Sequence, residues 1–291
     1  MTDPLEVLRQ PLVPLEPDPA FAARLRNRVR RALTEGETMT ASAATVTAAD
    51  GDIVYLSLRI PDADRARDFY RAVLGWRFGT GDDRPGTPHE QNSRQVQGQA
   101  IHIGIWNGQA DDGVGNPGIF IVRRVADLAT AIGRVRELGG TATEPFQNEH
   151  GVMSNCRDDQ GNAFTLVEMP GDEPRSPLNG ERPGDIVYIT MSPGDEERGS
   201  RFYGDLFGWE FTPGHVARGL NVDGPRPMTG MWGGTGRPLL EPVYGVADIA
   251  VAVRRIRELG GTATDPHREP YGLAAEGTDD QGLSFGLMQL G

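Results

Sequence analysis

The sequence predicts an α+β protein made of two copies of one domain, each copy containing two βαβββ modules, so that the chain holds four modules. Two observations predict this fold class. Long segments recur in the same order along the chain, and within each copy apolar residues alternate first with the period of a strand and then with that of a helix. The 291 residues are enough for two domains of ordinary size.

Internal repeats mark the two copies. The pentapeptide Gly51–Tyr55 returns as Gly184–Tyr188, with the sequence Gly-Asp-Ile-Val-Tyr in both places. Later in each copy, Asp-Asp-Gln-Gly occurs at Asp158–Gly161 and again at Asp279–Gly282. The first copy is longer between its two conserved blocks. We place the extra residues in the Gly/Pro/Gln-rich stretch from about Gly79 to Gly118 and expect a loop or a long hairpin there.

Composition before and between the repeats predicts a Pro-rich start (residues 1–17), a helix, a tether and a linker. Asp18 and Pro19 are suited to the N-cap and first position of an amphipathic helix, which a Thr/Ala/Ser-rich tether follows. A Gly/Pro-rich stretch separates the copies. The predicted boundaries are an N-terminal helical extension (1–50), a first domain (51–170), a linker (171–183) and a second domain (184–291).

The elements of the first domain follow in order. Apolar side chains at Val54, Leu56, Leu58 and Ile60 alternate with polar ones, which predicts a half-buried strand. Asp62 is suited to begin a helix and Gly75 to end it. Further strands are expected at Ile101–Trp106, Ile119–Val122 and Phe164–Glu168, and a second helix from Leu128 to Leu138. The second domain repeats this order.

Composition and charge exclude several function classes. The chain has 41 acidic and 29 basic residues, a net charge of −12, and no lysine among the basic ones. A Schiff-base lysine and a P-loop are therefore excluded, and binding to nucleic acids or anionic membranes is not expected. A single cysteine excludes a disulfide framework and a thiolate zinc cluster. No membrane span and no signal peptide are recognisable, so we expect a cytoplasmic protein.

The motifs resemble those of the vicinal-oxygen-chelate superfamily, which includes glyoxalase I, bleomycin-resistance proteins and extradiol dioxygenases. The resemblance rests on a strand followed by the segment Pro61–Trp76, then Leu-Gly-Gly, then Asp-x-x-Gly-Asn-x-Phe-x-Leu at Asp158–Leu166. It covers about residues 51–169 and again 184–290. The resemblance implies two glyoxalase-like domains, in each of which paired modules curl a sheet into a cup, with helices outside and a ligand inside.

Alternation along the strands predicts which side chains enter each cup, because successive residues of a strand point to opposite faces. Aromatic members of the set suit the stacking of a flat or cationic ligand. In the first domain the candidate ligand-binding residues are Tyr55, Ser57, Arg59, His102, Trp106, Phe120 and Thr165. In the second domain they are Tyr188, Thr190, Met228, Trp232 and Glu241.

Metal-using members of the superfamily carry ligands at four equivalent strand positions. The resemblance implies that these are Tyr55, His102, Phe120 and Thr165 in the first domain and Tyr188, Met228, Glu241 and Gly286 in the second. One imidazole beside a phenol, a phenyl ring and a hydroxyl is not a set that holds a divalent ion, and neither is one carboxylate beside a thioether and a glycine. We therefore predict no metal and no other cofactor, with a divalent metal at a non-standard site as the alternative.

His102 and Glu241 are the candidate catalytic residues. A neutral imidazole can donate or accept a proton near pH 7, and a carboxyl group in a mostly apolar cup acquires a raised pKa. Two alternatives stay open. His102 is satisfied by hydrogen bonds on a sheet face, or Glu241 faces solvent before Pro242 because the strand register differs by one residue.

Three functions remain open. The first is a glyoxalase/bleomycin-resistance-like protein that binds a small organic ligand, cationic or aromatic, in a cupped sheet without the family metal. The second is a lyase, isomerase or dioxygenase of the same superfamily, metal-dependent or using His102 or Glu241 for proton transfer. The third is an interaction protein whose N-terminal helix docks on its own domain or on a second subunit of a homodimer. If only one cup is active, the imidazole of His102 favours the first.

Overall fold

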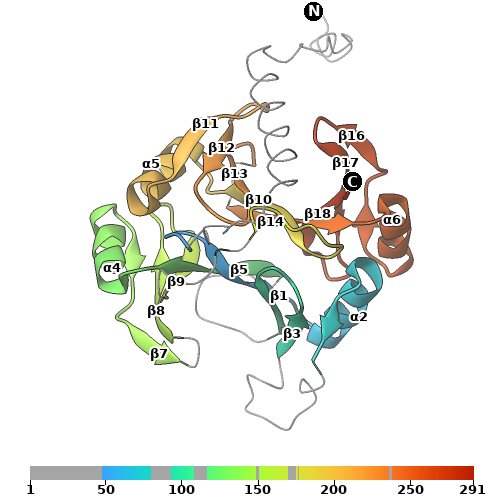
Figure 1. Ribbon diagram of the computed structural model, residues 1–291, viewed down its shortest axis with the longest axis horizontal. Helices are drawn as coiled ribbons and strands as arrows, with labels where there is room; N and C mark the ends of the chain where they lie inside the picture. The colour runs from blue at the N-terminus through green and yellow to red at the C-terminus, as the bar shows by residue number, and fades with distance from the viewer. Residues whose placement is uncertain are drawn as a thin grey trace, which may run out of the picture. The chain divides into compact units, whose positions relative to one another are not determined.

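The computed structural model describes residues 48–79, 93–107, 117–148, 151–169, 175, 177–235 and 238–291 (Figure 1). Residues Val46–Gly291 make one compact unit. The predicted N-terminal helix and most of the predicted insertion in the first domain lie outside the described residues. None of the described helices has a stretch long and apolar enough to cross a bilayer.

Two sheets of the same topology form the unit, one from each sequence copy. The first contains β1 (Ile53–Arg59), β2 (Arg77–Phe78), β3 (Ser93–Gln97), β4 (His102–Trp106), β5 (Gly118–Val125), β6 (Thr141–Ala142), β7 (Phe146–Asn148), β8 (Gly151–Arg157) and β9 (Ala163–Glu168). The second contains β10 (Ile186–Ser192), β11 (Glu210–Pro213), β12 (Gly219–Asp223), β13 (Thr229–Trp232), β14 (Leu239–Val246), β15 (Thr262–Ala263), β16 (His267–Glu269), β17 (Gly272–Thr278) and β18 (Ser284–Gln289).

Strand order confirms the predicted fold class. It runs β2-β3-β4-β1-β5-β9-β8-β6 in the first sheet, with β7 on β8, and β11-β12-β13-β10-β14-β18-β17-β15 in the second, with β16 on β17. The central pairs β1–β5 and β10–β14 are antiparallel and join the two βαβββ modules of each copy into one mixed sheet. The described chain is therefore α+β with two cupped-sheet domains.

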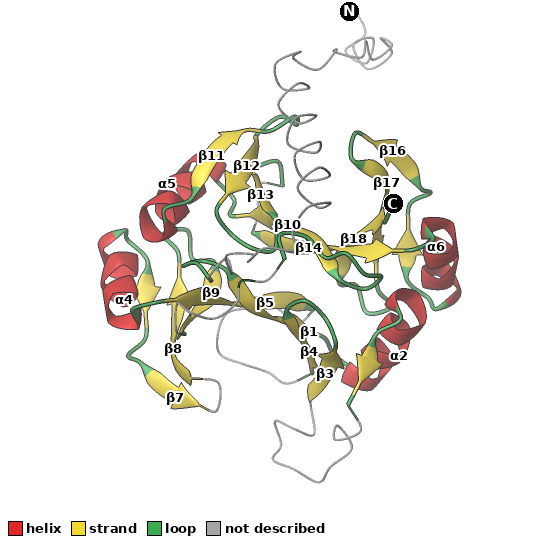
Figure 2. Ribbon diagram, viewed as in Figure 1, coloured by secondary structure: helices red, strands yellow, loops and turns green. Residues whose placement is uncertain are grey.

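Four described helices flank the sheets: α2 (Ala63–Leu74), α4 (Leu128–Glu137), α5 (Glu196–Phe207) and α6 (Ile249–Glu258). The predicted ends of α2 are confirmed. Asp62 accepts hydrogen bonds from the backbone N–H groups of Asp64 and Arg65, and Gly75 ends the helix with a φ of 72°, a conformation that favours glycine. Figure 2 shows α4 beside α5 and α2 beside α6, with the central strands between the two pairs.

The alternation in β1 differs from the prediction at its first residues. The register against β5 shifts between Ile53 and Tyr55, which is the sign of a β-bulge. Ile53 consequently joins the main core, whereas Val54 packs with Tyr55 on the opposite face, against a small cluster formed by Val122, Met153 and Val167. The alternation predicts that Val54 faces the helix-covered core with Leu56, Leu58 and Ile60. This was wrong for Val54, because a bulge places two successive residues outside the simple period of two.

Each Asp-Asp-Gln-Gly turn contacts the first turn of a helix in the other domain. The Gln281 side chain exchanges two hydrogen bonds with the backbone of Asp62, at 2.8 and 2.9 Å, and the Tyr70 hydroxyl donates to Asp279 at 3.1 Å. Asp280 forms an ion pair of 2.6 Å with Arg65. The repeated motif is therefore an interdomain contact as well as a turn.

The second contact repeats the first with the domains exchanged. Gln160 exchanges two hydrogen bonds of 2.9 Å with the backbone of Asp195, and Tyr203 donates to Asp158 at 3.0 Å. The main core cluster also contains residues of both domains. Contacts on both sides thus hold the two sheets in one orientation, which fixes where their concave faces lie.

Candidate functional site

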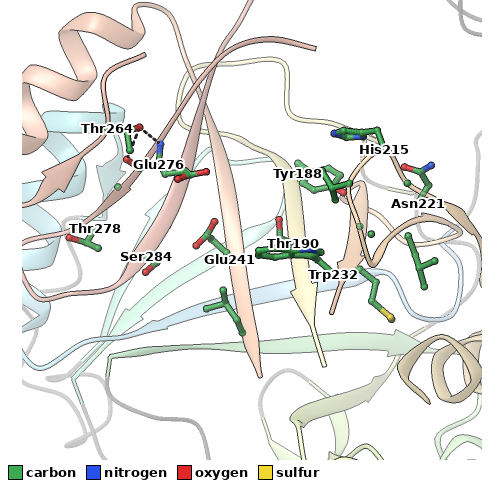
Figure 3. A pocket seen from close by; sticks show the side chains of 18 of the residues that line it. Tyr188, Thr190, His215, Asn221, Trp232, Glu241, Thr264, Glu276, Thr278 and Ser284 are labelled. Atoms are coloured by element: carbon green, nitrogen blue, oxygen red, sulfur yellow. Dashed lines mark hydrogen bonds between the residues drawn. The ribbon is translucent and has the colours of Figure 1, made fainter. Parts of the chain in front are cut away.

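A cavity of about 800 Å³ lies on the concave face of the second sheet (Figure 3). Strands β10, β12, β13, β14, β15, β17 and β18 contribute walls, together with the loop between β11 and β12. This volume is in the range that holds a drug-sized ligand. The lining side chains that matter most for its chemistry are Tyr188, Thr190, His215, Trp232, Glu241 and Glu276.

Strand register explains how these side chains converge. Thr190 on β10 pairs with Glu241 on β14, and paired residues point to the same face of a sheet. Figure 3 shows Glu241, Thr190 and Trp232 across the middle of the cavity, between Glu276 on one side and His215 on the other. Glu241 is among the residues that line the cavity, so the alternative in which it faces away from the cup does not hold.

A glycine makes room for the tyrosine in each cup. Any side chain at Gly230 would overlap the hydroxyl of Tyr188, and any side chain at Gly104 would overlap the hydroxyl of Tyr55. Both tyrosines therefore lie across the neighbouring strand. In the second cup this forms part of the cavity wall, and burial raises the pKa of the Tyr188 phenol, with Tyr271 adding to the shift.

The electrostatics of the second cavity are acidic. Burial raises the pKa of Glu241, and the charge of Glu276 raises it further. Within the described part of the chain, neither carboxylate has an ion-pair partner, and no arginine is among the residues that line the cavity. As far as the described residues extend, the cavity therefore offers negative charge without a counter-ion, beside aromatic walls.

Replacing Glu241 with glutamine is expected to stabilise the protein at pH 7. Because the pKa of Glu241 is higher in the folded than in the unfolded chain, the folded state binds more protons between the two values, and stability falls as pH rises through that window. Glu241→Gln removes this loss. Urea titrations at pH 7 and at pH 3 should show a gain at pH 7 that is absent at pH 3.

The matched control is Glu210→Gln on β11, where the side chain is exposed. It should change stability little at either pH. A Glu241→Gln variant that is less stable than the wild type at pH 7 would contradict the pKa argument.

The first cup is arranged differently, because its own Arg59 occupies it. Arg59 is 8% exposed, and its guanidinium carbon lies 4.2 Å from the ring centroid of Trp106 and 4.8 Å from that of Phe120. These are cation–π distances. The arginine therefore takes the space between the two rings where the sequence placed a ligand.

The remaining predicted residues of the first cup lie on the strands of the first sheet. Ser57 is buried and pairs with Gly104 and Phe120. Thr165 donates a hydrogen bond of 2.8 Å to Asn155. His102 begins β4 opposite Tyr55 and is exposed. The catalytic role predicted for His102 stays a prediction.

In the second domain the structure brings together Tyr188, Thr190, Trp232 and Glu241 as predicted lining residues of one cavity. Met228 is not among the lining residues. It precedes β13, where its backbone bonds to Ile189 and Leu178.

Sequence reasoning missed His215 and Glu276. His215 lies in a loop without periodicity, to which no role was assigned. The internal repeat could have drawn attention to Glu276. It stands three residues before its Asp-Asp-Gln-Gly turn, at the position that Asn155 holds in the first copy.

The residues at the four superfamily metal positions do not fit a divalent ion. In the first cup, Tyr55 pairs with His102 and with Val122, and Val122 pairs with Thr165. The groups near the single imidazole are therefore a phenol and a hydroxyl. In the second cup, Glu241 has carboxylate chemistry but Tyr188 is a phenol with a raised pKa. Among the described residues, no three His, Cys, Asp or Glu side chains are grouped where they could hold a metal ion. The donor chemistry thus departs from that of a metal site.

The two cupped sheets and their topology define a class of protein, and residues 55–167 match the family model of the glyoxalase-like domain. Residues 55–167 are thus similar to a glyoxalase-like domain, and the second sheet repeats their topology, so the chain has the tandem, two-domain fold of the vicinal-oxygen-chelate superfamily. The anthracycline biosynthesis protein DauV from Streptomyces sp. (strain C5) is 27% identical over 267 residues, which cover 83% of this chain and 94% of DauV.

Solved structures share the fold over most of the chain. A crystal structure of catechol 2,3-dioxygenase superposes with a TM-score of 0.58 at 16% identity, covering 83% of this chain and 88% of the dioxygenase. The Mn(II)-bound glyoxalase from Novosphingobium aromaticivorans gives a TM-score of 0.59 at 14% identity, covering 84% of this chain and 83% of the glyoxalase. At these identities the likeness concerns the fold.

Proposed function

We propose that the protein binds a small organic molecule in the cavity of its second domain, without a metal ion at the superfamily positions. The observation that carries this proposal is the cavity of about 800 Å³, with Tyr188 and Trp232 as aromatic walls and Glu241 between its strands. The first cup instead contains the side chain of Arg59. The proposal therefore places the ligand in the second cup, whereas the sequence favoured the first.

The relative DauV supports an aromatic ligand. Its name connects it with the biosynthesis of anthracyclines, which are polycyclic aromatic compounds. A flat ring system suits the walls of the second cavity, because aromatic faces stack favourably in offset or edge-on arrangements. We propose an aromatic ligand for this chain because of the walls of its own cavity. The relative suggests anthracyclines as the first compounds to test.

A second candidate function is an enzyme of the same superfamily, a lyase, isomerase or dioxygenase. The observation that favours it is the raised pKa of Glu241, which keeps this carboxyl group closer to the range of a general acid or base, in the same cavity as His215. A dioxygenase would require a metal. Elemental analysis of protein purified without chelators distinguishes a metal-dependent enzyme from the metal-free binding protein, since one bound metal ion per chain contradicts the metal-free proposal. Assembly as a homodimer stays a prediction, which analytical ultracentrifugation tests.

Ligand binding is tested with daunorubicin, an anthracycline whose fluorescence reports binding. We expect saturable binding at one site per chain, and Thr190→Trp, which fills the cavity, should weaken it at least about tenfold, or about 1.4 kcal/mol. Thr212→Trp on the exposed face of β11 is the matched control and should bind like the wild type. Equal binding to the wild type and Thr190→Trp would place the ligand elsewhere. No binding of daunorubicin or of any aromatic compound in a metabolite panel would overturn the proposal.

A further inference from the structure

The internal repeat allows the two cups to be compared residue by residue. Arg59 stands four residues after Tyr55 on β1, and Ser192 stands four residues after Tyr188 on β10. Trp106 pairs with Arg59 in the first sheet. In the second sheet Met191 pairs with Met231, so Ser192 and Trp232 are the next residues of the same two strands. The two tryptophans thus hold equivalent positions.

The second residue that contacts Arg59 in the first cup, Phe120, has a different counterpart in the second cup. Phe120 pairs with Ser57 across β1 and β5, and Glu241 pairs with Thr190 across β10 and β14. Since Ser57 and Thr190 are equivalent in the repeat, Glu241 stands where the first cup has Phe120. The second cup therefore keeps one aromatic ring, loses the arginine and gains a carboxylate.

The replacement of arginine by serine leaves space in the second cup. Ser192 is buried and its hydroxyl bonds to the backbone oxygen of Trp232 and to Thr235. It is not among the residues that line the cavity, whereas Trp232 and Glu241 both are. The counterparts of the two residues whose rings flank the Arg59 guanidinium group thus both line open space in the second cup.

Charge makes the empty position suitable for a cation. A guanidinium group is planar, stacks on aromatic faces and bonds to carboxylates in a forked geometry. In the first cup two rings hold it, at 4.2 and 4.8 Å. In the second, a ring and a carboxylate are available, Glu276 adds a second negative charge, and none of the described residues that line the cavity is an arginine.

We propose that the second cup binds a planar cation of an external ligand, a guanidinium or amidinium group, at the position that the side chain of Arg59 occupies in the first cup, with Trp232 and Glu241 as its partners. This inference rests on the proposed function, because it names the ligand class of the same cavity. The raised pKa of Glu241 agrees with it, since an approaching cation would favour the ionised carboxylate and would be bound more tightly as pH rises.

The test uses two probes of nearly the same shape, phenylguanidine, which is a cation at pH 7, and phenylurea, which is neutral. Isothermal titration calorimetry on the full chain should show phenylguanidine binding at least about tenfold more tightly than phenylurea, a difference of about 1.4 kcal/mol. Glu241→Gln should remove this preference. Glu210→Gln, on exposed β11, is the matched control and should keep it.

A second variant recreates the first cup. Ser192→Arg is expected to place its own guanidinium in the cavity and to abolish phenylguanidine binding, while Ser192→Ala, which adds no cation, keeps it. Circular dichroism establishes that each variant is folded, and the Glu241→Gln comparison remains decisive if Ser192→Arg is not.

The outcomes separate the two proposals. Equal affinities for phenylguanidine and phenylurea, or an unchanged preference in Glu241→Gln, would overturn the cation site while leaving ligand binding in the cup intact. Binding of daunorubicin without any binding of phenylguanidine would do the same. If none of the three compounds binds to the wild type, both the cation site and the proposed function fail.

Discussion

Replacing Trp76 with alanine is expected to lower the free energy of unfolding by about 3–5 kcal/mol, the range for deleting a buried tryptophan. Trp76 is 1% exposed. Its ring stacks on Tyr70 at a centroid distance of 5.0 Å and meets the edge of Tyr244 at 5.4 Å. Its indole N–H donates to the backbone oxygen of Gly184 at 2.9 Å. Since Gly184 and Tyr244 belong to the second domain, the substitution removes contacts between the domains as well as within the first.

Urea titration followed by circular dichroism measures this effect. Trp232→Ala is the matched control, because Trp232 is 37% exposed on the wall of the second cavity and its removal leaves no buried void. It should change stability by less than about 1 kcal/mol while weakening daunorubicin binding. Similar losses of stability in the two variants would contradict the assignment of Trp76 to the core and of Trp232 to the ligand site.

Local signals in the sequence were sufficient for the helices and central strands and for the fold class, but not for the shorter outer strands. Asp62 and Gly75 bound α2 because capping depends on the residue itself and its nearest backbone groups. The repeated segments determined that both sheets have one topology, since equivalent sequences meet the same packing constraints. What the alternation could not show was the bulge at Ile53–Tyr55, because the register between β1 and β5 depends on residues far apart in the chain.

The candidate site was only partly predictable for a related reason. Alternation places Arg59 on the concave face of the first cup, but whether its long side chain extends to solvent or lies between Trp106 and Phe120 depends on residues from three strands. The imidazole of His102 therefore drew attention to the cup that Arg59 already occupies. In the second cup, His215 comes from a loop, and no periodicity relates a loop residue to a cavity.

The Asp-Asp-Gln-Gly turn shows, for a single motif, which contacts the sequence can predict and which it cannot. The sequence predicts a turn before a strand, and the structure has one, with Asp279 accepting hydrogen bonds of 2.9 Å from the backbone N–H groups of Gln281 and Leu283. The contact with Tyr70 in the other domain could not be predicted, because it depends on how the sheets pack. One aspartate thus serves both the turn and the interface.

Asp279→Ala is therefore expected to destabilise the whole described unit by about 3–5 kcal/mol, since each buried donor that loses its acceptor costs about 1–3 kcal/mol. Asp279 is 2% exposed and accepts three hydrogen bonds, one of them from the Tyr70 hydroxyl at 3.1 Å. Asp280→Ala is the matched control in the same turn. Its ion pair with Arg65, whose side chain is 58% exposed, should contribute less than about 1 kcal/mol.

The two domains should respond to Asp279→Ala together. Because Asp279 lies in the second domain and Tyr70 in the first, loss of their hydrogen bond weakens both sides of one interface. Hydrogen exchange measured by mass spectrometry should show lower protection in β1 as well as in β18, whereas Asp280→Ala should leave both nearly unchanged. A loss of protection confined to the second sheet would mean that the domains unfold independently. That result would contradict the role of the repeated turn as an interdomain contact that stabilises the cup bearing the proposed ligand site.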